Sequence, residues 1–382
     1  MHLLKSTFAI ISILTTMILS QSNIKITFRV NTPPLYKNQN VFITGNSESL
    51  GEWNPNAVML DRVSDKLFEK TISFPKGAAI EFKFTLGSWE SEAIFIKGEI
   101  SANFTHKVKD ETTLTYNAIE WGTNANHTSK GQITGTVKYH RDVEGVNVRK
   151  RDIIVWLPPN YDIAKDARYP ILYMHDGQNI FDPKTCGFGV DWQIDEAADS
   201  LIRNGKIEPI IIVGIYNTPA RGIEYIPGDT GESYMKFVVE TVKPLIDKTY
   251  RTLPGRENTA VGGSSLGGLI SFMMAWQYDN IFSKAICFSP AFKIRSIDYV
   301  KTAAKSTVKK DIKLYIYNGG LDLEAVLQTG IDDMLELLNS KGYKPITDYI
   351  WEHDPTATHN EAAWAKHIRS ALLFLFGNNI MR

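Results

Sequence analysis

The sequence contains very little cysteine: Cys186 and Cys287 are the only two among 382 residues. Its stability therefore cannot depend on a disulfide framework of the kind that holds small secreted domains together. One bond between the two thiols stays open as an alternative. However, Cys287 lies in a predicted buried strand, which favours two free thiols acting as small apolar groups.

The sequence also lacks net charge and long apolar runs. Lysine and arginine total 42, and aspartate and glutamate total 42. A chain without excess charge has no electrostatic footprint for nucleic acid or an anionic membrane surface, so its partners must be recognised through local sites. Beyond the first twenty residues, no apolar run approaches the roughly 20 residues that span a bilayer.

The first 22 residues are typical of a secretory signal peptide. Lys5 precedes an apolar stretch, and the small residues Ser20 and Ser22 follow it as cleavage positions. An uncleaved anchor is the alternative. Glycosylation sequons begin at Asn103 and Asn126, which fits an exported glycoprotein. We therefore expect the protein to be extracellular or in the lumen of the secretory pathway.

The pattern after the signal peptide predicts two domains joined by a polar linker over 121–131. Residues 24–120 hold short β-rich runs separated by Asn, Gly, Pro and Asp, which indicates an all-β, immunoglobulin-like sandwich. From 132 to 382, apolar strands alternate with helices, which indicates an α/β fold with a mostly parallel sheet covered on both faces. Candidate strands there are 153–157, 170–174, 210–213, 259–261, 285–288, 314–317 and 348–351, and candidate helices lie near 190–203, 232–246, 266–277, 324–341 and 361–376.

The segment 263–267, Gly-Ser-Ser-Leu-Gly, matches the G-x-S-x-G pattern between a predicted strand and a predicted helix. The pattern places a nucleophile at the apex of a sharp turn, and the flanking glycines allow the backbone to pass closely. Ser265 is the predicted nucleophile, and Ser264 is the alternative in the next register. A glycine-rich turn without chemistry is the competing interpretation.

In α/β-hydrolases the acid and then the histidine follow the serine along the chain. His359 lies in a loop just past a strand end, where a base must sit, whereas His353 is a second choice and His367 falls inside a helix. For the acid, Asp322 lies closer to its strand end than Glu324, which looks like a residue of a first helical turn, where the helix dipole favours a carboxylate in any case. We predict Asp322, with Glu324 as the alternative.

Acyl transfer also needs two N–H donors for the developing oxyanion. The amide of Leu266 follows the nucleophile, and the amide of Gln178 lies in the loop after an earlier strand. An ordinary Asp-Gly turn is the competing interpretation of that loop. The predicted triad needs no metal and no organic cofactor.

The second domain resembles a family of esterases that includes enterochelin esterases, feruloyl esterases and the antigen 85 mycolyltransferases. The matching stretches are 156–161, 173–179, 221–225, 262–268 and 359–364, within about 132–378. The resemblance implies an α/β-hydrolase fold and a serine esterase, and it supports Gln178 as an oxyanion donor. Family members often use glutamate as the acid, which keeps Glu324 open.

The first domain resembles the starch-binding modules of carbohydrate-binding family 20, through 41–55, 81–84 and Trp89-Glu. In that family two tryptophans and a lysine hold a glucan, and the matching residues are Trp53, Trp89 and Lys83. Tyr36 is a weak match to a second sugar site. The sequence departs from the family after Trp89, so the fold is better supported than starch specificity, and the tryptophans could instead be core residues.

Together these features predict a secreted serine esterase that acts on carbohydrate-linked or siderophore-like esters and binds a starch-like polysaccharide. Acyl transfer to sugar hydroxyls would use the same triad. A non-catalytic carbohydrate-binding protein is the alternative from another class, and the complete set of serine, acid, histidine and oxyanion donors argues against it.

Overall fold

The computed structural model describes residues 22–88, 91–95, 103–121, 133–186 and 189–378. Most of the predicted signal peptide, Trp89, most of the predicted linker and the sequon at Asn126 lie outside the described residues. By its internal contacts the chain divides into two compact units, Met1–Gly122 and Thr123–Arg382, and each is considered by itself.

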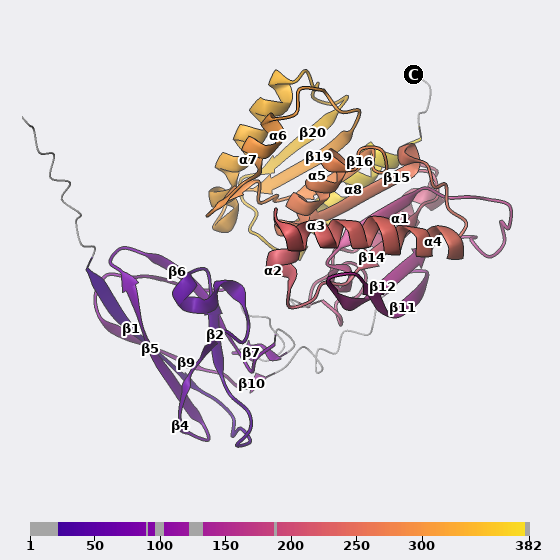
Figure 1. The fold of residues 1–382 in the computed structure, drawn as a ribbon. Coiled ribbons are helices and arrows are strands. Elements are labelled where there is room, and N and C mark those ends of the chain that lie inside the picture. The colour runs from indigo at the N-terminus through magenta and orange to yellow at the C-terminus, as the bar shows by residue number, and fades with distance from the viewer. Residues whose placement is uncertain (1–21, 89–90, 96–102, 122–132, 187–188, 379–382) are drawn as a thin grey trace, which may run out of the picture. The chain divides into compact units, whose positions relative to one another are not determined.

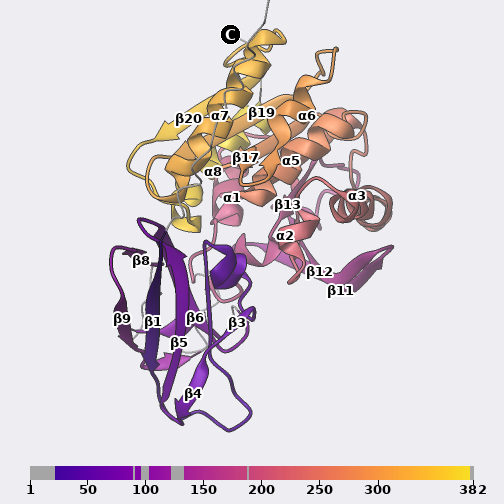
Figure 2. The same cartoon turned by 60° about the vertical axis from the view of Figure 1, so that its left-hand side comes forward.

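The first unit is a β-sandwich built from two four-stranded sheets (Figure 1). In one, β1 (Asn23–Asn31) pairs antiparallel with β5 (Leu67–Pro75) and parallel with β9 (Thr112–Asn117), and Figure 2 shows these three strands side by side. Every second residue along the end of β1 is buried, as expected for a strand with one face on a core. The remaining strands are β2 (Phe42–Gly45), β3 (Val58–Met59), β4 (Asp61–Ser64), β6 (Ala79–Thr85) and β8 (Phe104–Lys107), with a separate pair of β7 (Ala93–Ile94) and β10 (Glu120–Trp121).

The second unit is organised around one eight-stranded sheet, in the order β11-β12-β14-β13-β15-β16-β19-β20. From β14 to β20 all neighbours are parallel, whereas β11 and β12 form an antiparallel hairpin at one edge. The strands are β11 (Thr136–Gly145), β12 (Val148–Leu157), β13 (Ile171–His175), β14 (Ile211–Ile215), β15 (Thr259–Ser264), β16 (Lys284–Phe288), β19 (Lys313–Gly319) and β20 (Tyr349–Asp354). The predicted α/β-hydrolase type of sheet, preceded by an all-β sandwich, is confirmed.

Helices cover both faces of this sheet (Figure 1). One face packs against α1 (Ile194–Arg203) and α8 (Glu361–Phe376), and the other packs against α5 (Leu266–Gln277) and α7 (Leu323–Ser340) together with shorter segments. Strands β13, β14 and β15 are buried at every residue, because apolar helices lie above and below them. The same arrangement brings the carboxyl ends of six parallel strands to one edge, where ligands of such sheets bind.

The predicted helix over 232–246 differs from the structure, which divides that stretch into three segments. They are α3 (Asp229–Lys236), a π-helical turn η4 (Phe237–Val242) and α4 (Lys243–Thr249). The sequence did not predict several short elements. They are the helices α2 (Arg221–Glu224) and α6 (Tyr299–Ala304), the hairpin of β17 (Lys293–Ile294) and β18 (Ile297–Asp298), and the 3-10 helices η1 (Glu48–Trp53), η3 (Gly177–Asn179) and η5 (Arg256–Asn258). Among the described residues, no helix combines the length and the apolarity needed to cross a membrane.

Candidate active site

Ser265 lies at the sharp turn between β15 and α5, at the carboxyl edge of the sheet. Its backbone has φ 59° and ψ −123°, a conformation that non-glycine residues adopt rarely and that clusters at functional sites. The residue is partly exposed, whereas Ser264 in the neighbouring register is a buried strand residue. The turn therefore presents the hydroxyl of Ser265 and not that of Ser264.

Both glycines of the motif lie where the chain packs closely. A Cβ atom on Gly263 would lie 2.9 Å from the carbonyl carbon of Gly267, so no side chain fits there. A Cβ atom on Gly267 would lie 3.2 Å from Oδ2 of Asp176, which comes from the loop after β13. The nucleophile turn thus packs directly on the loop that was predicted to hold the oxyanion.

His359 lies in the loop between β20 and α8, and its Nδ1 atom is 3.1 Å from Oε2 of Glu324. Glu324 lies in the first turn of α7, after β19, and its side chain is fully buried. Because β15, β16, β19 and β20 are consecutive neighbours in the sheet, Ser265, Glu324 and His359 all follow strands that end at the same edge. A carboxylate that accepts from Nδ1 leaves Nε2 of the imidazole as the nitrogen that can face a nucleophile.

The prediction of Asp322 as the acid differs from the contacts in the structure. Asp322 has φ 53° and ψ −121°, nearly the backbone angles of Ser265, and its side chain is exposed. That turn directs residue 322 to solvent and brings residue 324 into the interior, where it meets His359. Proximity to the strand end was therefore the wrong criterion, and the alternative, Glu324, is the residue in contact.

Ser289 and Trp364 complete this part of the site. The Ser289 hydroxyl donates to Oε1 of Glu324 at 2.6 Å and accepts from the indole N–H of Trp364 at 2.9 Å. The Trp364 ring meets the His359 ring edge to face, with centroids 5.1 Å apart. We call Ser289, Glu324, His359 and Trp364 the histidine side of the site. Sequence reasoning missed Ser289, although a serine before Pro290 at a strand end was a usable signal.

The histidine side is connected to the nucleophile turn through the backbone. The amide of Ser265 donates to the carbonyl of Phe288 at 2.9 Å, and Phe288 directly precedes Ser289. In the part of the chain that the structure describes, no hydrogen bond joins the Ser265 hydroxyl to the His359 ring. Such contacts are often long in free enzymes and shorten when substrate binds.

On the opposite side of Ser265, an ion pair between a half-buried arginine and a buried carboxylate supports the loop after β13. Arg221 donates from Nε to Oδ1 and from Nη2 to Oδ2 of Asp176, both at 2.8 Å, and Asn217 donates to Oδ1 at 2.6 Å. Burial alone would raise the pKa of Asp176, but the charge and hydrogen bonds of Arg221 bring that pKa below its ordinary value. This carboxylate is therefore a fixed charge at neutral pH.

Gln178, the predicted donor, lies in this loop within the single turn η3. Its side-chain oxygen accepts from the amide of Asn217 at 3.1 Å, and its carbonyl accepts from the Thr185 hydroxyl at 2.6 Å. Leu266 is the first residue of α5, where N–H groups have no acceptor within the helix. We call Asp176, Gln178, Asn217 and Arg221 the oxyanion side of the site. Sequence reasoning found Arg221 only within a matching stretch and gave it no role.

A buried histidine at the end of β13 supports the loop that carries Asp176 and Gln178. His175 is fully buried, and its Nδ1 atom is 2.7 Å from the hydroxyl of Tyr234 in α3. Burial lowers the pKa of His175 to about 3, so the ring is neutral. Of the other two candidate histidines, His353 is exposed, and His367 lies in α8 with its Nδ1 atom 3.1 Å from Oε1 of Glu352.

The predicted sugar-binding residues lie in the first unit. Lys83 is buried and its ammonium group is 2.6 Å from Oε1 of Glu92, which differs from the prediction of a lysine that contacts a glucan, because this charge already has a buried partner. Tyr36 is 79% exposed, so its ring is accessible to a ligand. The side chain of Trp53 and the whole of Trp89 lie outside the described residues.

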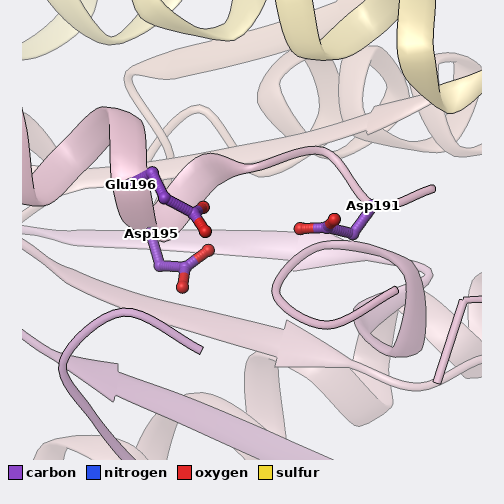
Figure 3. A group of neighbouring side chains, drawn as sticks. All are labelled: Asp191, Asp195 and Glu196. Atoms are coloured by element: carbon purple, nitrogen blue, oxygen red, sulfur yellow. The ribbon is translucent and has the colours of Figure 1, made fainter. Parts of the chain in front are cut away.

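Three carboxylates gather at the start of α1: Asp191, Asp195 and Glu196, whose oxygens lie within 4.8 Å of one another. Figure 3 shows Asp195 and Glu196 facing each other from the first turn, with Asp191 pointing toward them from the preceding loop. Oxygen ligands at this spacing suit a hard divalent cation. Two of them already serve the fold, because Asp195 accepts from the amide of Thr134 at 2.6 Å and Asp191 from that of Gln193 at 3.0 Å. Burial raises the pKa of Asp191 to about 6 and that of Asp195 to about 9.

The two cysteines take no part in this chemistry. Cys186 and Cys287 are both buried and form no disulfide with each other, in agreement with the prediction of two thiols that pack as apolar groups. Burial raises the pKa of the Cys287 thiol well above its ordinary value, which makes it a poor nucleophile.

Comparison with known proteins gives a match in each unit. A family model described as "Putative esterase" matches residues 147–375, and one described as "Starch binding domain" matches residues 23–134. An endo-1,4-beta-xylanase/feruloyl esterase of Xylanibacter ruminicola is 28% identical over 194 residues, which are 50% of this chain and 25% of that protein. The match thus spans only a quarter of the length of that relative.

Two solved structures show the same fold. A ferulic acid esterase superposes with a TM-score of 0.53 at 19% identity, over 63% of this chain and 98% of its own. The enterobactin esterase from Shigella flexneri superposes with a TM-score of 0.51 at 11% identity, over 94% of each chain. The second structure extends the likeness of fold over most of this chain.

Proposed function

Because the chain belongs to the esterase family whose model matches residues 147–375, we propose that it hydrolyses carboxylic esters by a serine mechanism. Ser265 is the nucleophile, His359 the general base and Glu324 the acid that orients the imidazole. The observation that carries the proposal is the contact of 3.1 Å between His359 and the buried Glu324, at the sheet edge that also holds the strained turn of Ser265. The chain carries an esterase domain and a starch-binding domain, and the finer assignments below build on that pair.

In the proposed reaction, His359 accepts the proton of the Ser265 hydroxyl as its oxygen attacks the ester carbonyl carbon. The tetrahedral intermediate then expels the alcohol, which takes the proton from His359 and leaves an acyl group on Ser265. Water attacks this acyl group with the help of His359, and the acid is released with the hydroxyl of Ser265 restored. Glu324 stabilises the imidazolium that forms in both halves of the cycle.

The oxyanion would be held by the amides of Leu266 and Gln178. Helix α5 adds the positive end of its dipole next to Leu266, and the ion pair of Asp176 with Arg221 fixes the loop that carries Gln178. Removal of one such donor from an esterase site costs roughly 3 kcal/mol of transition-state stabilisation. The two donors lie on separate loops, so their spacing depends on the packing of Gly267 against Asp176.

For the substrate, we propose an ester in which the acid or the alcohol is joined to a carbohydrate, with a starch-like polysaccharide bound by the first unit. The starch-binding match and the name of the feruloyl esterase relative support this choice. Exposed aromatic rings such as Tyr36 suit the apolar faces of sugars, since a flat ring covers area at small entropic cost. Retention on insoluble starch, compared with retention on cellulose, tests this half of the proposal.

We further propose that the protein is exported and glycosylated. Asn103, at the start of a sequon, is exposed, and its side-chain amide donates to Glu81 at 3.2 Å. Export predicts that the protein accumulates outside the cell or in a secretory compartment, beginning near residue 23. A shift in mass after treatment with a glycosidase would show that a sugar is attached, and an intact N-terminus in the mature protein would contradict cleavage.

The catalytic proposal is tested with a fluorophosphonate probe and a chromogenic short-chain ester. Ser265→Ala should abolish labelling and lower kcat on the order of 10⁶, as the loss of a triad nucleophile does. Ser264→Ala is the matched control, because the two residues are adjacent and Ser264 is a buried strand residue. Labelling that survives Ser265→Ala and disappears in Ser264→Ala would move the nucleophile by one residue, and loss in neither variant would refute the proposal.

A further inference from the structure

Glu361 is a buried carboxyl group beside the active site that the proposed reaction does not use. It lies in the first turn of α8, two residues after His359, and only 3% of it is exposed. Its Oε1 atom accepts from the side-chain amide of Asn179 at 3.1 Å, and Asn179 directly follows Gln178. Glu361 therefore joins the loop of the base to the loop of the oxyanion donor.

The second oxygen of Glu361, Oε2, is buried and has no hydrogen-bond partner among the described residues. Two charged groups face Glu361 from other elements: Asp176 after β13, and Arg221 in α2. Arg221 already donates to both oxygens of Asp176, so Glu361 has no cation of its own. An ionised carboxylate in this position would be buried without a paired charge, which proteins avoid by keeping the group protonated.

We propose that Glu361 is a positioning residue, a neutral carboxylic acid that fixes the oxyanion loop against the histidine loop. The inference rests on the proposed esterase function of the same site. In the neutral form, Glu361 accepts from Asn179 without placing a negative charge near the amide of Gln178. When the proton leaves to solvent, the charge that appears lies beside Asp176 and close to the place where the oxyanion must form.

The balance of local effects agrees with a neutral acid. Burial, with a smaller contribution from the nearby Asp176 carboxylate, raises the pKa of Glu361 to about 8, although its own backbone amide, Arg221 and Asn179 act to lower it. The first turn of a helix favours a negative charge, but this effect is smaller than the effect of complete burial. The site should therefore lose activity above pH 8 for a reason unrelated to His359.

Glu361→Gln is the decisive variant, because an amide keeps the acceptor for Asn179 and cannot ionise. At pH 7 its kcat and KM should match those of the wild type. At pH 9, one unit above the pKa of about 8, the wild type should retain about a tenth of its kcat and the variant should retain nearly all of it. An alkaline limb that is identical in both proteins would overturn the proposal.

Stability gives a second readout that does not require catalysis. The native carboxyl holds its proton up to about pH 8, whereas the unfolded one loses it near 4.5, so the folded wild type loses stability as pH rises between these values. The melting temperature of Glu361→Gln relative to the wild type should therefore rise from pH 5 to pH 8 and then level off. Glu336→Gln, at an exposed position of α7, is the matched control and should show no such trend.

The two readouts separate this inference from the function on which it rests. If the wild type hydrolyses no ester while the stability trend is present, the esterase proposal fails and Glu361 is still a neutral buried acid. If hydrolysis depends on Ser265 but neither the alkaline limb nor the stability trend changes in Glu361→Gln, the inference about Glu361 is wrong and the esterase proposal stands.

Discussion

The two sides of Ser265 are built from different kinds of interaction. On the histidine side, a single buried carboxylate, Glu324, is surrounded by the hydroxyl of Ser289 and the imidazole of His359, and no arginine or lysine contacts it among the described residues. On the oxyanion side, the carboxylate of Asp176 is held by two hydrogen bonds from the guanidinium of Arg221. Both carboxylates are buried, yet only one of them is neutralised by a permanent charge.

This difference indicates that Glu324 and Asp176 have different roles, one in the reaction and the other in the fold. A carboxylate without a permanent counter-ion can stabilise a positive charge that forms only during the reaction, as on an imidazolium. A carboxylate that is saturated by an arginine cannot respond to the reaction, and it serves instead to fix the backbone around it. Changes on the histidine side should therefore lower the rate in a folded protein, whereas changes on the oxyanion side should lower stability.

The largest effect is expected for Glu324→Gln. The variant keeps the shape of the side chain but cannot stabilise the imidazolium, so kcat for a chromogenic ester should fall on the order of 10⁴. Circular dichroism and the melting temperature should stay close to those of the wild type. Asp322→Asn is the matched control, two residues away and exposed, and should keep full activity. A loss in Asp322→Asn with full activity in Glu324→Gln would reverse our reading of the site.

The next effect is expected for Arg221→Ala, measured by urea unfolding. The substitution leaves Asp176 buried without its counter-ion, so the free energy of unfolding should fall by about 3–5 kcal/mol. Arg203→Ala removes a pair with Asp199 in which the arginine is largely exposed, and it should cost less than about 1 kcal/mol. Equal costs for the two variants would show that the oxyanion side is not a stabilising element.

The smallest effect is the pH dependence of the stability that the pair of Asp176 and Arg221 contributes. The pKa of Asp176 is lower in the folded protein than its ordinary value of 3.8, so its contribution to stability is present above 3.8 and is lost as pH falls through the folded value. The difference in unfolding free energy between the wild type and Arg221→Ala should be largest near pH 7 and should shrink in acid, beginning above 3.8, because burial without Arg221 raises the pKa of Asp176 in the variant. Unfolding in urea at a series of acid pH values measures it, and a difference that grows in acid would contradict the assignment.

The sequence predicted those parts of the site that depend on repeating patterns. The start of α5 at Leu266 and of α8 at Glu361 follow from apolar periodicity, and the order of serine, acid and histidine then left few candidates for the base. The choice between Asp322 and Glu324 could not be made in this way, because one positive φ angle at residue 322 decides which side chain is buried.

Contacts between segments that are distant in the sequence could not be predicted either. The partners of Ser289 and Arg221 are set only when the sheet assembles, and their hydrogen bonds to Glu324 and Asp176 cannot be read from the local sequence. For Lys83, the resemblance to a family suggested a contact with a sugar, whereas the structure gives the side chain a buried partner in Glu92. In each case the deciding fact is a tertiary contact and not a local preference.

The contact between Gly267 and Asp176 has a consequence for how this enzyme could change its substrate. A side chain at residue 267 would press on the carboxylate of Asp176, so a substitution in the nucleophile helix would also displace the oxyanion loop. In the loop between β20 and α8, the side chain of Thr356 is exposed and its hydroxyl bonds only to the neighbouring Asp354 among the described residues. We therefore expect new acyl or sugar preferences to arise by variation at exposed positions such as Thr356, where a substitution leaves the nucleophile turn and the oxyanion loop in place.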